Sequence, residues 1–149
     1  MDIRIATSKD IDTLMDIRLE MLRVVNHMEE DEPFSEQLLG CSKDYFLNGN
    51  QTTCLAFDGD KAIGCASISY IEVMPTFSHP TGKRAHLMNV YTNKNYQRQG
   101  IAKQMVNLLI DDAREKHSTE ISLDATDEGR PLYEKLGFKV SDECMVMSI

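Results

Sequence analysis

The sequence predicts an α/β fold in which helices cover the faces of one mixed β-sheet. Three observations predict it: strand-like and helix-periodic segments alternate along the chain, a hairpin signal lies near the middle, and proline or glycine marks the ends of several segments. The 149 residues suffice for one core, and no repeat, low-complexity run or linker divides them. We therefore expect a single domain over residues 1–149.

The N-terminal third is expected to form a short strand and two helices. Residues 3–6 alternate as a strand, and Thr7 or Ser8 then caps the first helix. Ser35 is expected to open the second helix, which ends near Asn48. The apolar positions of the first helix recur at helical spacing, at Ile11, Leu14, Met15, Leu22 and Val25.

The middle of the chain predicts a β-hairpin and a further strand. Residues 52–57 and 61–73 are rich in β-branched and apolar side chains and flank Asp58-Gly59-Asp60, a strong turn signal. Residues 84–92 form the next predicted strand.

The last third is expected to alternate between helix and strand. A long amphipathic helix begins at about residue 101 and ends near Lys116, and residues 120–125 form a strand. Pro131 lies in the first turn of a short helix that Gly137 ends, and residues 143–149 form a final strand. The predicted order is therefore βααββ followed by βαβαβ.

Composition excludes several classes of protein. The net charge of −8 argues against a nucleic-acid partner, and no apolar run reaches the roughly 18 residues that a membrane span needs. The N-terminus lacks the basic and apolar regions of a signal peptide. The four cysteines (Cys41, Cys54, Cys65 and Cys144) are scattered and form no C-x-x-C pair, so we expect free thiols in a reducing cytoplasm and no metal site.

The positive charge is concentrated in one acid-free segment. Residues 73–110 contain no Asp or Glu but five basic residues, Lys83, Arg84, Lys94, Arg98 and Lys103. A basic island in an acidic chain suggests a localised anionic ligand, although chance clustering of solvated charges would give the same pattern.

A glycine lies where the long helix should begin, in the stretch YQRQGIAKQM (residues 96–105). The N-terminus of a helix leaves about four N–H groups unpaired and carries roughly half a positive charge, which favours phosphate. Gly100 and Ala102 are small enough for an anion to approach the backbone. The segment matches neither a P-loop nor a G-x-G-x-x-G fingerprint, so it predicts a phosphate site of another kind.

Two stretches resemble the GNAT superfamily of N-acetyltransferases. Residues 97–102 match the family's acetyl-CoA signature [QR]-x-x-G-x-[GA], within HLMNVYTNKNYQRQGIA, and RPLYEKLGFK (residues 130–139) matches its other familiar stretch. The resemblance extends to the order of elements and covers nearly the whole chain. It implies a central twisted, mixed, mostly antiparallel sheet of about six to seven strands with about four helices, and with the fourth and fifth strands splayed apart.

The resemblance implies where acetyl-CoA lies. The main chain of Val90, Tyr91 and Thr92 would pair with the pantetheine arm, as in β-augmentation. The loop and first helical turn would hold the pyrophosphate through the signature residues Gln97, Arg98, Gln99, Gly100, Ile101, Ala102 and Lys103. The side chains of Arg98 and Lys103 would contact phosphate in this arrangement, but solvated surface roles fit them as well.

Three residues are candidates for proton transfer. Tyr133 matches the family's tyrosine near the CoA sulfur, where a phenol donates to the departing thiolate; packing of its helix is the alternative. The predicted fourth strand has no carboxylate where family members often place a glutamate, and His86 lies near that position. His86 as a structural histidine remains an equal alternative, and Asp124 is the second candidate base.

The acceptor site is the least defined part of the prediction. In the family it lies between the first two helices and the loop before the fourth strand. Glu29 and Glu30 there would attract a cationic amine, and Phe34 and Phe77 would form apolar walls; a solvated acidic turn and core aromatics explain the same residues.

The resemblance implies an enzyme that moves acetyl from acetyl-CoA to a primary amine, on a small molecule or peptide, by direct attack in a ternary complex. A non-catalytic CoA-binding sensor or interaction module and an acyltransferase for another acyl-CoA are the alternatives. We expect no nucleic-acid or membrane partner and no metal. Members of the family often form homodimers, so the resemblance implies that a homodimer is one possible oligomeric state.

Overall fold

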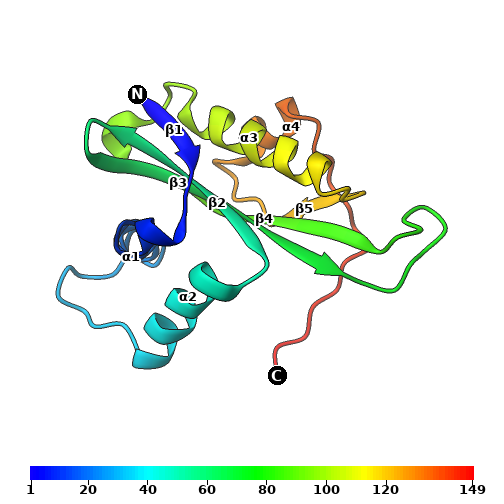
Figure 1. Cartoon of the computed structure of the whole chain (residues 1–149), viewed down its shortest axis with the longest axis horizontal. Coiled ribbons are helices and arrows are strands. Elements are labelled where there is room, and N and C mark those ends of the chain that lie inside the picture. The colour runs from blue at the N-terminus through cyan, green and yellow to red at the C-terminus, as the bar shows by residue number, and fades with distance from the viewer.

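Helices cover both faces of a five-stranded mixed sheet in the computed structural model, which describes residues 1–149 (Figure 1). The strands are β1 (Asp2–Ile5), β2 (Gln51–Asp58), β3 (Lys61–Glu72), β4 (Lys83–Thr92) and β5 (Ile121–Leu123). They lie in the order β1-β2-β3-β4-β5, and only the β4–β5 pair is parallel. The mixed, mostly antiparallel α/β sheet is confirmed, with five strands where six to seven were expected.

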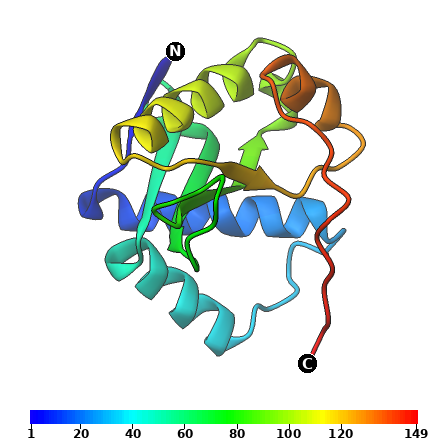
Figure 2. The same ribbon diagram turned by 90° about the vertical axis from the view of Figure 1, so that its right-hand side faces the viewer.

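Four α-helices surround the sheet, with α1 and α2 on one face and α3 on the other (Figure 2). They are α1 (Ile11–Val25), α2 (Glu36–Asn48), α3 (Ile101–Glu115) and α4 (Arg130–Lys135), with 3₁₀ turns η1 (Ser8–Asp10) and η2 (Lys94–Tyr96). Tyr133 on α4 and Leu136 just after it pack against the apolar cluster under α3. None of the helices is long and apolar enough to cross a membrane.

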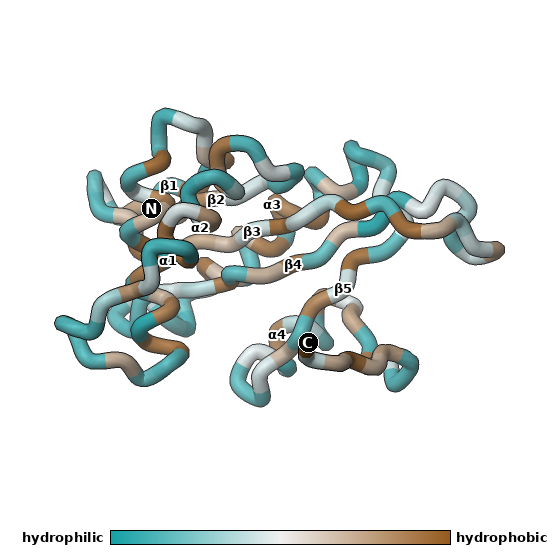
Figure 3. Tube along the Cα trace, turned by 90° about the horizontal axis from the view of Figure 1, so that it is seen from below, coloured by the Kyte–Doolittle hydropathy of each residue, from teal (hydrophilic) through white to brown (hydrophobic).

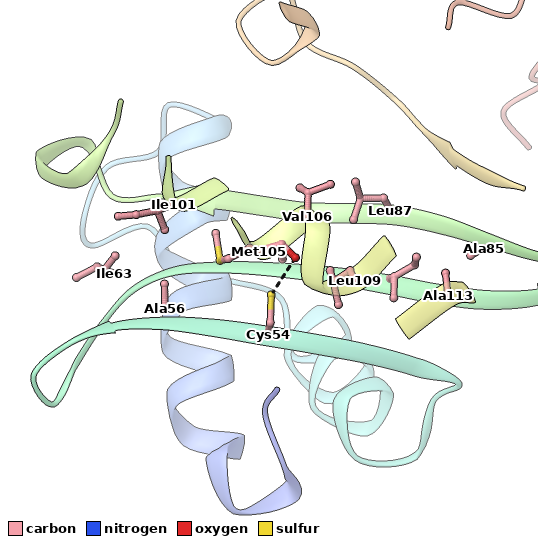
Figure 4. Packing of buried hydrophobic residues seen from close by; sticks show 12 residues of the cluster. Cys54, Ala56, Ile63, Ala85, Leu87, Ile101, Met105, Val106, Leu109 and Ala113 are labelled. Atoms are coloured by element: carbon pink, nitrogen blue, oxygen red, sulfur yellow. Dashed lines mark hydrogen bonds between the residues drawn. The ribbon is translucent and has the colours of Figure 1, made fainter. Parts of the chain in front are cut away.

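The larger core lies between α3 and the sheet (Figure 4). Met105, Val106 and Leu109 of α3 are fully buried against strands β2, β3 and β4. Burying such side chains contributes about 1.5–3 kcal/mol each. A smaller cluster on the opposite face joins α1 to β2 and β3 through Leu14, Ile17, Leu55 and Cys65. Because Ala85 and Leu87 of β4 belong to the larger cluster, they face α3. The side chain between them in the sequence faces α1 and α2.

The N-terminal helices begin as the sequence predicts. Thr7 forms a capping box with Asp10 around η1, and Ser35 Oγ accepts a hydrogen bond of 3.1 Å from the N–H of Leu38. The inward face of α1 differs from the prediction, because Leu14, Ile17 and Met21 are the buried residues and Val25 is 59% exposed. The stripe follows the i, i+3, i+7 spacing, and Val25 lies in the last turn, beyond the edge of the core.

The C-terminal strand predicted over residues 143–149 is absent. No strand follows α4, and four apolar side chains of this segment are at least 85% exposed: Met145, Val146, Met147 and Ile149. The strand β5 is also shorter than predicted, with three residues in place of six. An apolar, β-branched pattern favours a strand, but a strand forms only where an edge pairs with its N–H and C=O groups.

The four cysteines divide into two buried and two exposed thiols. Cys54 and Cys65 have no exposed surface, and burial raises the pKa of each thiol to about 12. Cys41 and Cys144 are exposed, and none of the four is in a disulfide. Because the thiolate is the reactive form, we expect a thiol reagent to label two cysteines in the native protein and four after unfolding.

The Cys41→Ser, Cys144→Ser double variant is the control for this labelling, and it should react only once it is unfolded. Rapid labelling of all four thiols in the native protein would contradict the packing described above.

Candidate active site

The strands β4 and β5 pair over only three residues and then separate (Figure 3). The last pair is Leu87 with Leu123, and β4 continues to Thr92 without β5 beside it. The splay that was expected from the family resemblance is therefore present. An extended ligand lying along this free side of β4 would meet main-chain groups in the way an added strand does.

A β-bulge lies on β4 just beyond the point of separation. The pairing shifts between Cys65 with Tyr91 and Ser67 with Met88, so that Asn89 and Val90 oppose a single residue of β3. Asn89 adopts φ +59°, a left-handed conformation that asparagine tolerates better than most residues. Bulges of this kind often lie next to active sites, where they redirect a side chain.

A row of free backbone N–H groups follows β4. None of the N–H groups from Arg98 to Lys103 donates to a protein acceptor, and α3 has no side-chain cap at Gly100. Arg98 (φ +64°) and Gly100 (φ +79°) are both left-handed, which makes the loop similar to the backbone nests that bind anions. The N–H groups and the positive end of α3 suit a pyrophosphate.

The backbone conformation gives a second reason for glycine at position 100, besides the close approach of an anion. At φ +79° any side chain is strained, so the backbone conformation itself requires glycine. A Cβ built there meets nothing within 4 Å, so it would project into open space at the helix N-terminus. The loop therefore fits the pyrophosphate of CoA, because the space at its N–H groups is free.

Two side chains anchor the start of the loop. Gln97 Nε2 donates to the carbonyl of Thr92 at 3.2 Å, and the Tyr96 hydroxyl donates to Asp58 Oδ2 at 2.6 Å. The Thr92 hydroxyl is buried without a partner. Arg98 and Lys103 are exposed and make no hydrogen bond or ion pair within the protein, which leaves both side chains free for a ligand.

His86 and Asp124 come together at the edge where β4 and β5 still pair. His86 Nε2 lies 3.7 Å from Asp124 Oδ2, and His86 Nδ1 lies 2.8 Å from Ser122 Oγ. His86 opposes Ser69, whose hydroxyl accepts a hydrogen bond from Tyr45 of α2, so its side chain lies on the face that α1 and α2 cover. The Asp124 carboxylate is fully exposed.

Tyr133 lies on the opposite face of the sheet, on α4. Its ring packs edge-on against Phe138 at 5.9 Å, and it contacts the cluster under α3. Burial raises the pKa of the Tyr133 hydroxyl, and this hydroxyl has no hydrogen-bond partner in the protein. A half-buried phenol without a partner is a proton donor that remains free for a ligand.

The residues predicted for the acceptor site lie apart from this group. The carbonyl of Glu29 accepts a hydrogen bond of 2.9 Å from Arg23, whose guanidinium lies 4.4 Å from the centre of the Phe34 ring. Glu30 is exposed and unpaired. Phe77 is fully exposed in the β3–β4 loop, so the core role considered for it is wrong.

Sequence analysis missed two residues that the structure places beside the separating strands. Arg18 Nη1 of α1 donates to Asn89 Oδ1 at 2.9 Å. The position of Arg18 next to the buried Ile17 indicates only that its side chain is partly buried. Its partner Asn89 is 71 residues away in the sequence, so no local pattern predicts the contact. The left-handed bulge at Asn89 has no signature in the periodicity of the strand.

The chain matches the model of the Acetyltransferase (GNAT) family over residues 11–138, and it belongs to this family of N-acetyltransferases. It is similar to a predicted acetyltransferase from Clostridium acetobutylicum whose crystal structure contains acetyl-CoA. The TM-score is 0.86 and the identity 29%, over 99% of this chain and 95% of the other.

The chain is also similar in sequence to two acetyltransferases. Glucosamine 6-phosphate N-acetyltransferase of Trypanosoma brucei brucei is 25% identical over 131 residues, which is 86% of each chain. The uncharacterized N-acetyltransferase YitH of Bacillus subtilis (strain 168) is 46% identical over 57 residues, 38% of this chain and 20% of the relative.

Proposed function

We propose that residues 1–149 form one catalytic domain, which transfers an acetyl group from acetyl-CoA directly to a primary amine. The observation that carries the proposal is the row of free N–H groups from Arg98 to Lys103, beside strands that separate after Leu87. The similar structure from C. acetobutylicum contains acetyl-CoA, which supports this donor.

The donor would lie between β4 and the start of α3. The pantetheine arm pairs with the free side of β4 at Val90, Tyr91 and Thr92, and the pyrophosphate accepts from the loop N–H groups. The unpaired side chains of Arg98 and Lys103 add positive charge at the mouth. This arrangement brings the thioester to the point where β4 and β5 separate.

The reaction needs one proton acceptor and one proton donor. His86 takes a proton from the protonated amine, whose nitrogen then attacks the thioester carbon. The new N–C bond forms as the C–S bond breaks, and the thiolate accepts a hydrogen bond or a proton from Tyr133. His86 and Tyr133 lie on opposite faces of the sheet. The proton acceptor and the proton donor therefore approach the reacting carbon from different sides.

His86→Ala is expected to slow turnover at neutral pH and to remove the rise of kcat/KM with pH that depends on a base at this position. Part of the rate should return at higher pH, because more amine is then deprotonated in solution. The measurement is the pH profile of kcat/KM for the variant and the wild-type enzyme.

His79→Ala is the matched control for the pH profile. His79 is also held by a hydroxyl and a carboxylate, with Nδ1 2.8 Å from Thr119 Oγ1 and Nε2 3.3 Å from Glu120 Oε2. The pH inflection should persist in this variant. A wild-type profile in His86→Ala would exclude His86 as the base, and Asp124→Asn would be tested next.

A thiol-release screen tests the proposed function. Acetyl-CoA is offered with amino acids, polyamines, aminoglycosides, peptide N-termini and amino sugar phosphates, the last because of the T. brucei relative. We expect CoA release that depends on the acceptor. Tight binding of acetyl-CoA without release for any amine would favour the sensor, and faster release from another acyl-CoA would change the donor.

A further inference from the structure

A half-buried arginine on α1 has no acidic partner. Arg18 Nη1 donates to Asn89 Oδ1 at 2.9 Å, and Arg18 takes part in none of the ion pairs of the protein. Its other guanidinium N–H groups lack a protein partner, and no unpartnered nitrogen of Arg18 is shut off from solvent. Burial lowers the pKa of Arg18 because it removes water from the charged group.

The protein holds the other arginines with resolved contacts through carboxylates or carbonyls. Arg4, Arg84 and Arg114 pair with carboxylates, although Arg84 Nε is buried without a partner, and Arg23 donates to two backbone carbonyls. Guanidinium groups that lose water without gaining an anion are costly, so such a group often serves a ligand. Arg18 differs from these four arginines because its one partner is a neutral amide, although burial has removed part of its water.

The position of Arg18 is set by the bulge on β4. Asn89 lies two residues beyond the last β4–β5 pair, at the point where the thioester is expected. The guanidinium reaches β4 on the face that α1 and α2 cover, which is also the face of His86. His86 and Asn89 are three positions apart, which is roughly 10 Å along a strand.

A chain of hydrogen bonds holds Asn89 in this orientation. Asn89 Nδ2 donates to Ser67 Oγ at 3.1 Å, Ser67 Oγ lies 2.7 Å from Thr53 Oγ1, and Thr53 Oγ1 donates to Gln51 Oε1 at 2.6 Å. The amide nitrogen is thus used by the sheet, and the amide oxygen faces Arg18. A residue held in this way positions the guanidinium before a ligand arrives.

Glu20, two residues further along the same helix, is already engaged. Its Oε2 accepts a hydrogen bond of 3.3 Å from Asn93, and burial together with a hydrogen bond to Glu20 raises the pKa of Tyr91. Glu20 lies within 4.0 Å of no basic side chain. The guanidinium therefore keeps its full charge for a ligand on this face.

We propose that Arg18 binds an oxyanion of the acceptor, so that the substrate is an amine that also carries a carboxylate or a phosphate. A guanidinium binds either group through parallel N–H donors, which fixes the orientation of the acceptor as well as its affinity. The inference rests on the proposed function and revises the cationic acceptor expected from the acidic residues at 29–32. It places the amine toward His86 and the anionic group toward Asn89.

The test compares matched amines with and without the oxyanion. Lysine against cadaverine forms the carboxylate arm, and glucosamine 6-phosphate against glucosamine forms the phosphate arm. The wild-type enzyme should prefer the member with the oxyanion in at least one pair. Arg18→Met should raise KM for that member roughly 10- to 100-fold, the loss expected for a charged hydrogen bond, and leave KM for acetyl-CoA and for the member without the oxyanion nearly unchanged.

Arg23→Met is the control, because it removes an arginine from the same helix that is bound to the loop after α1. It should leave the preference for amines with the oxyanion intact. Arg18→Lys keeps the positive charge but lacks the parallel N–H donors of the guanidinium, so it should give an intermediate KM. This variant provides the test if Arg18→Met is unstable.

Each outcome bears on a different claim. Equal turnover of amines with and without the oxyanion, or equal losses for both in Arg18→Met, would overturn the role of Arg18 and leave the acetyltransferase activity standing. Absence of turnover with every amine would overturn the proposed function, and the inference with it.

Discussion

Gly100→Val is expected to weaken acetyl-CoA binding by roughly a hundredfold or more while the protein stays folded. Valine at φ +79° is strained by roughly 1–3 kcal/mol, and relief of that strain rotates the backbone and turns the N–H groups of the loop away from the ligand. The branched side chain also occupies the open space in which the pyrophosphate is expected. Calorimetric titration with acetyl-CoA measures the change.

Gly59→Val separates this effect from backbone strain. Gly59 has φ +59° in the β2–β3 turn, and a Cβ there also meets nothing within 4 Å. The two variants should therefore lose similar free energies of unfolding, while only Gly100→Val loses affinity for acetyl-CoA. Unchanged affinity in folded Gly100→Val would show that the pyrophosphate binds elsewhere.

Tyr133→Phe is expected to lower kcat by roughly tenfold to a thousandfold, the range for loss of one placed proton donor. The ring contact with Phe138 at 5.9 Å survives in phenylalanine, and the lost hydroxyl has no partner in the protein. The free energy of unfolding and the affinity for acetyl-CoA should therefore change little. Steady-state kinetics and thermal unfolding of the same preparation measure both.

Tyr70→Phe is the matched tyrosine control. Its hydroxyl donates to Asp112 at the far end of α3, so this variant should lose stability and keep its kcat. A fully active Tyr133→Phe enzyme would show that Tyr133 serves packing and that another group supports the departing thiolate.

Most of the fold was predictable because its signals are local. The capping residue Ser35, the Asp58-Gly59-Asp60 turn and the apolar stripe of α3 each determine their element without help from distant residues. The prediction failed at residues 143–149, where a segment of strand-like composition pairs with no strand, although β5 has an unpaired outer edge. It also extended β5, because the sequence does not show where β4 and β5 separate.

The residues of the site also divide into those that local sequence predicts and those that depend on distant contacts. The loop that we propose as the phosphate site was predictable, since Gly100 and the helix after it are contiguous in sequence. The contact of Arg18 with Asn89 was not, because it depends on the packing of α1 and on a one-residue bulge in β4. The proximity of His86 to Asp124 likewise follows from the register of β4 against β5, which periodicity does not determine.

Direct transfer to an amine is the central claim, and no cysteine is suitably placed for a covalent intermediate. Cys54 and Cys65 are buried with raised pKa values, and neither Cys41 nor Cys144 makes a hydrogen bond to a histidine. A nucleophile in a covalent mechanism would need such a base beside it.

The most direct test is mass spectrometry after a rapid quench, with isotope-labelled acetyl-CoA and the best acceptor from the thiol-release screen. Direct attack predicts that each CoA released matches one labelled acetyl group on the nitrogen of the amine, while the mass of the intact protein stays unchanged throughout turnover. A labelled acetyl group that accumulates on the protein and then passes to the amine would contradict direct attack.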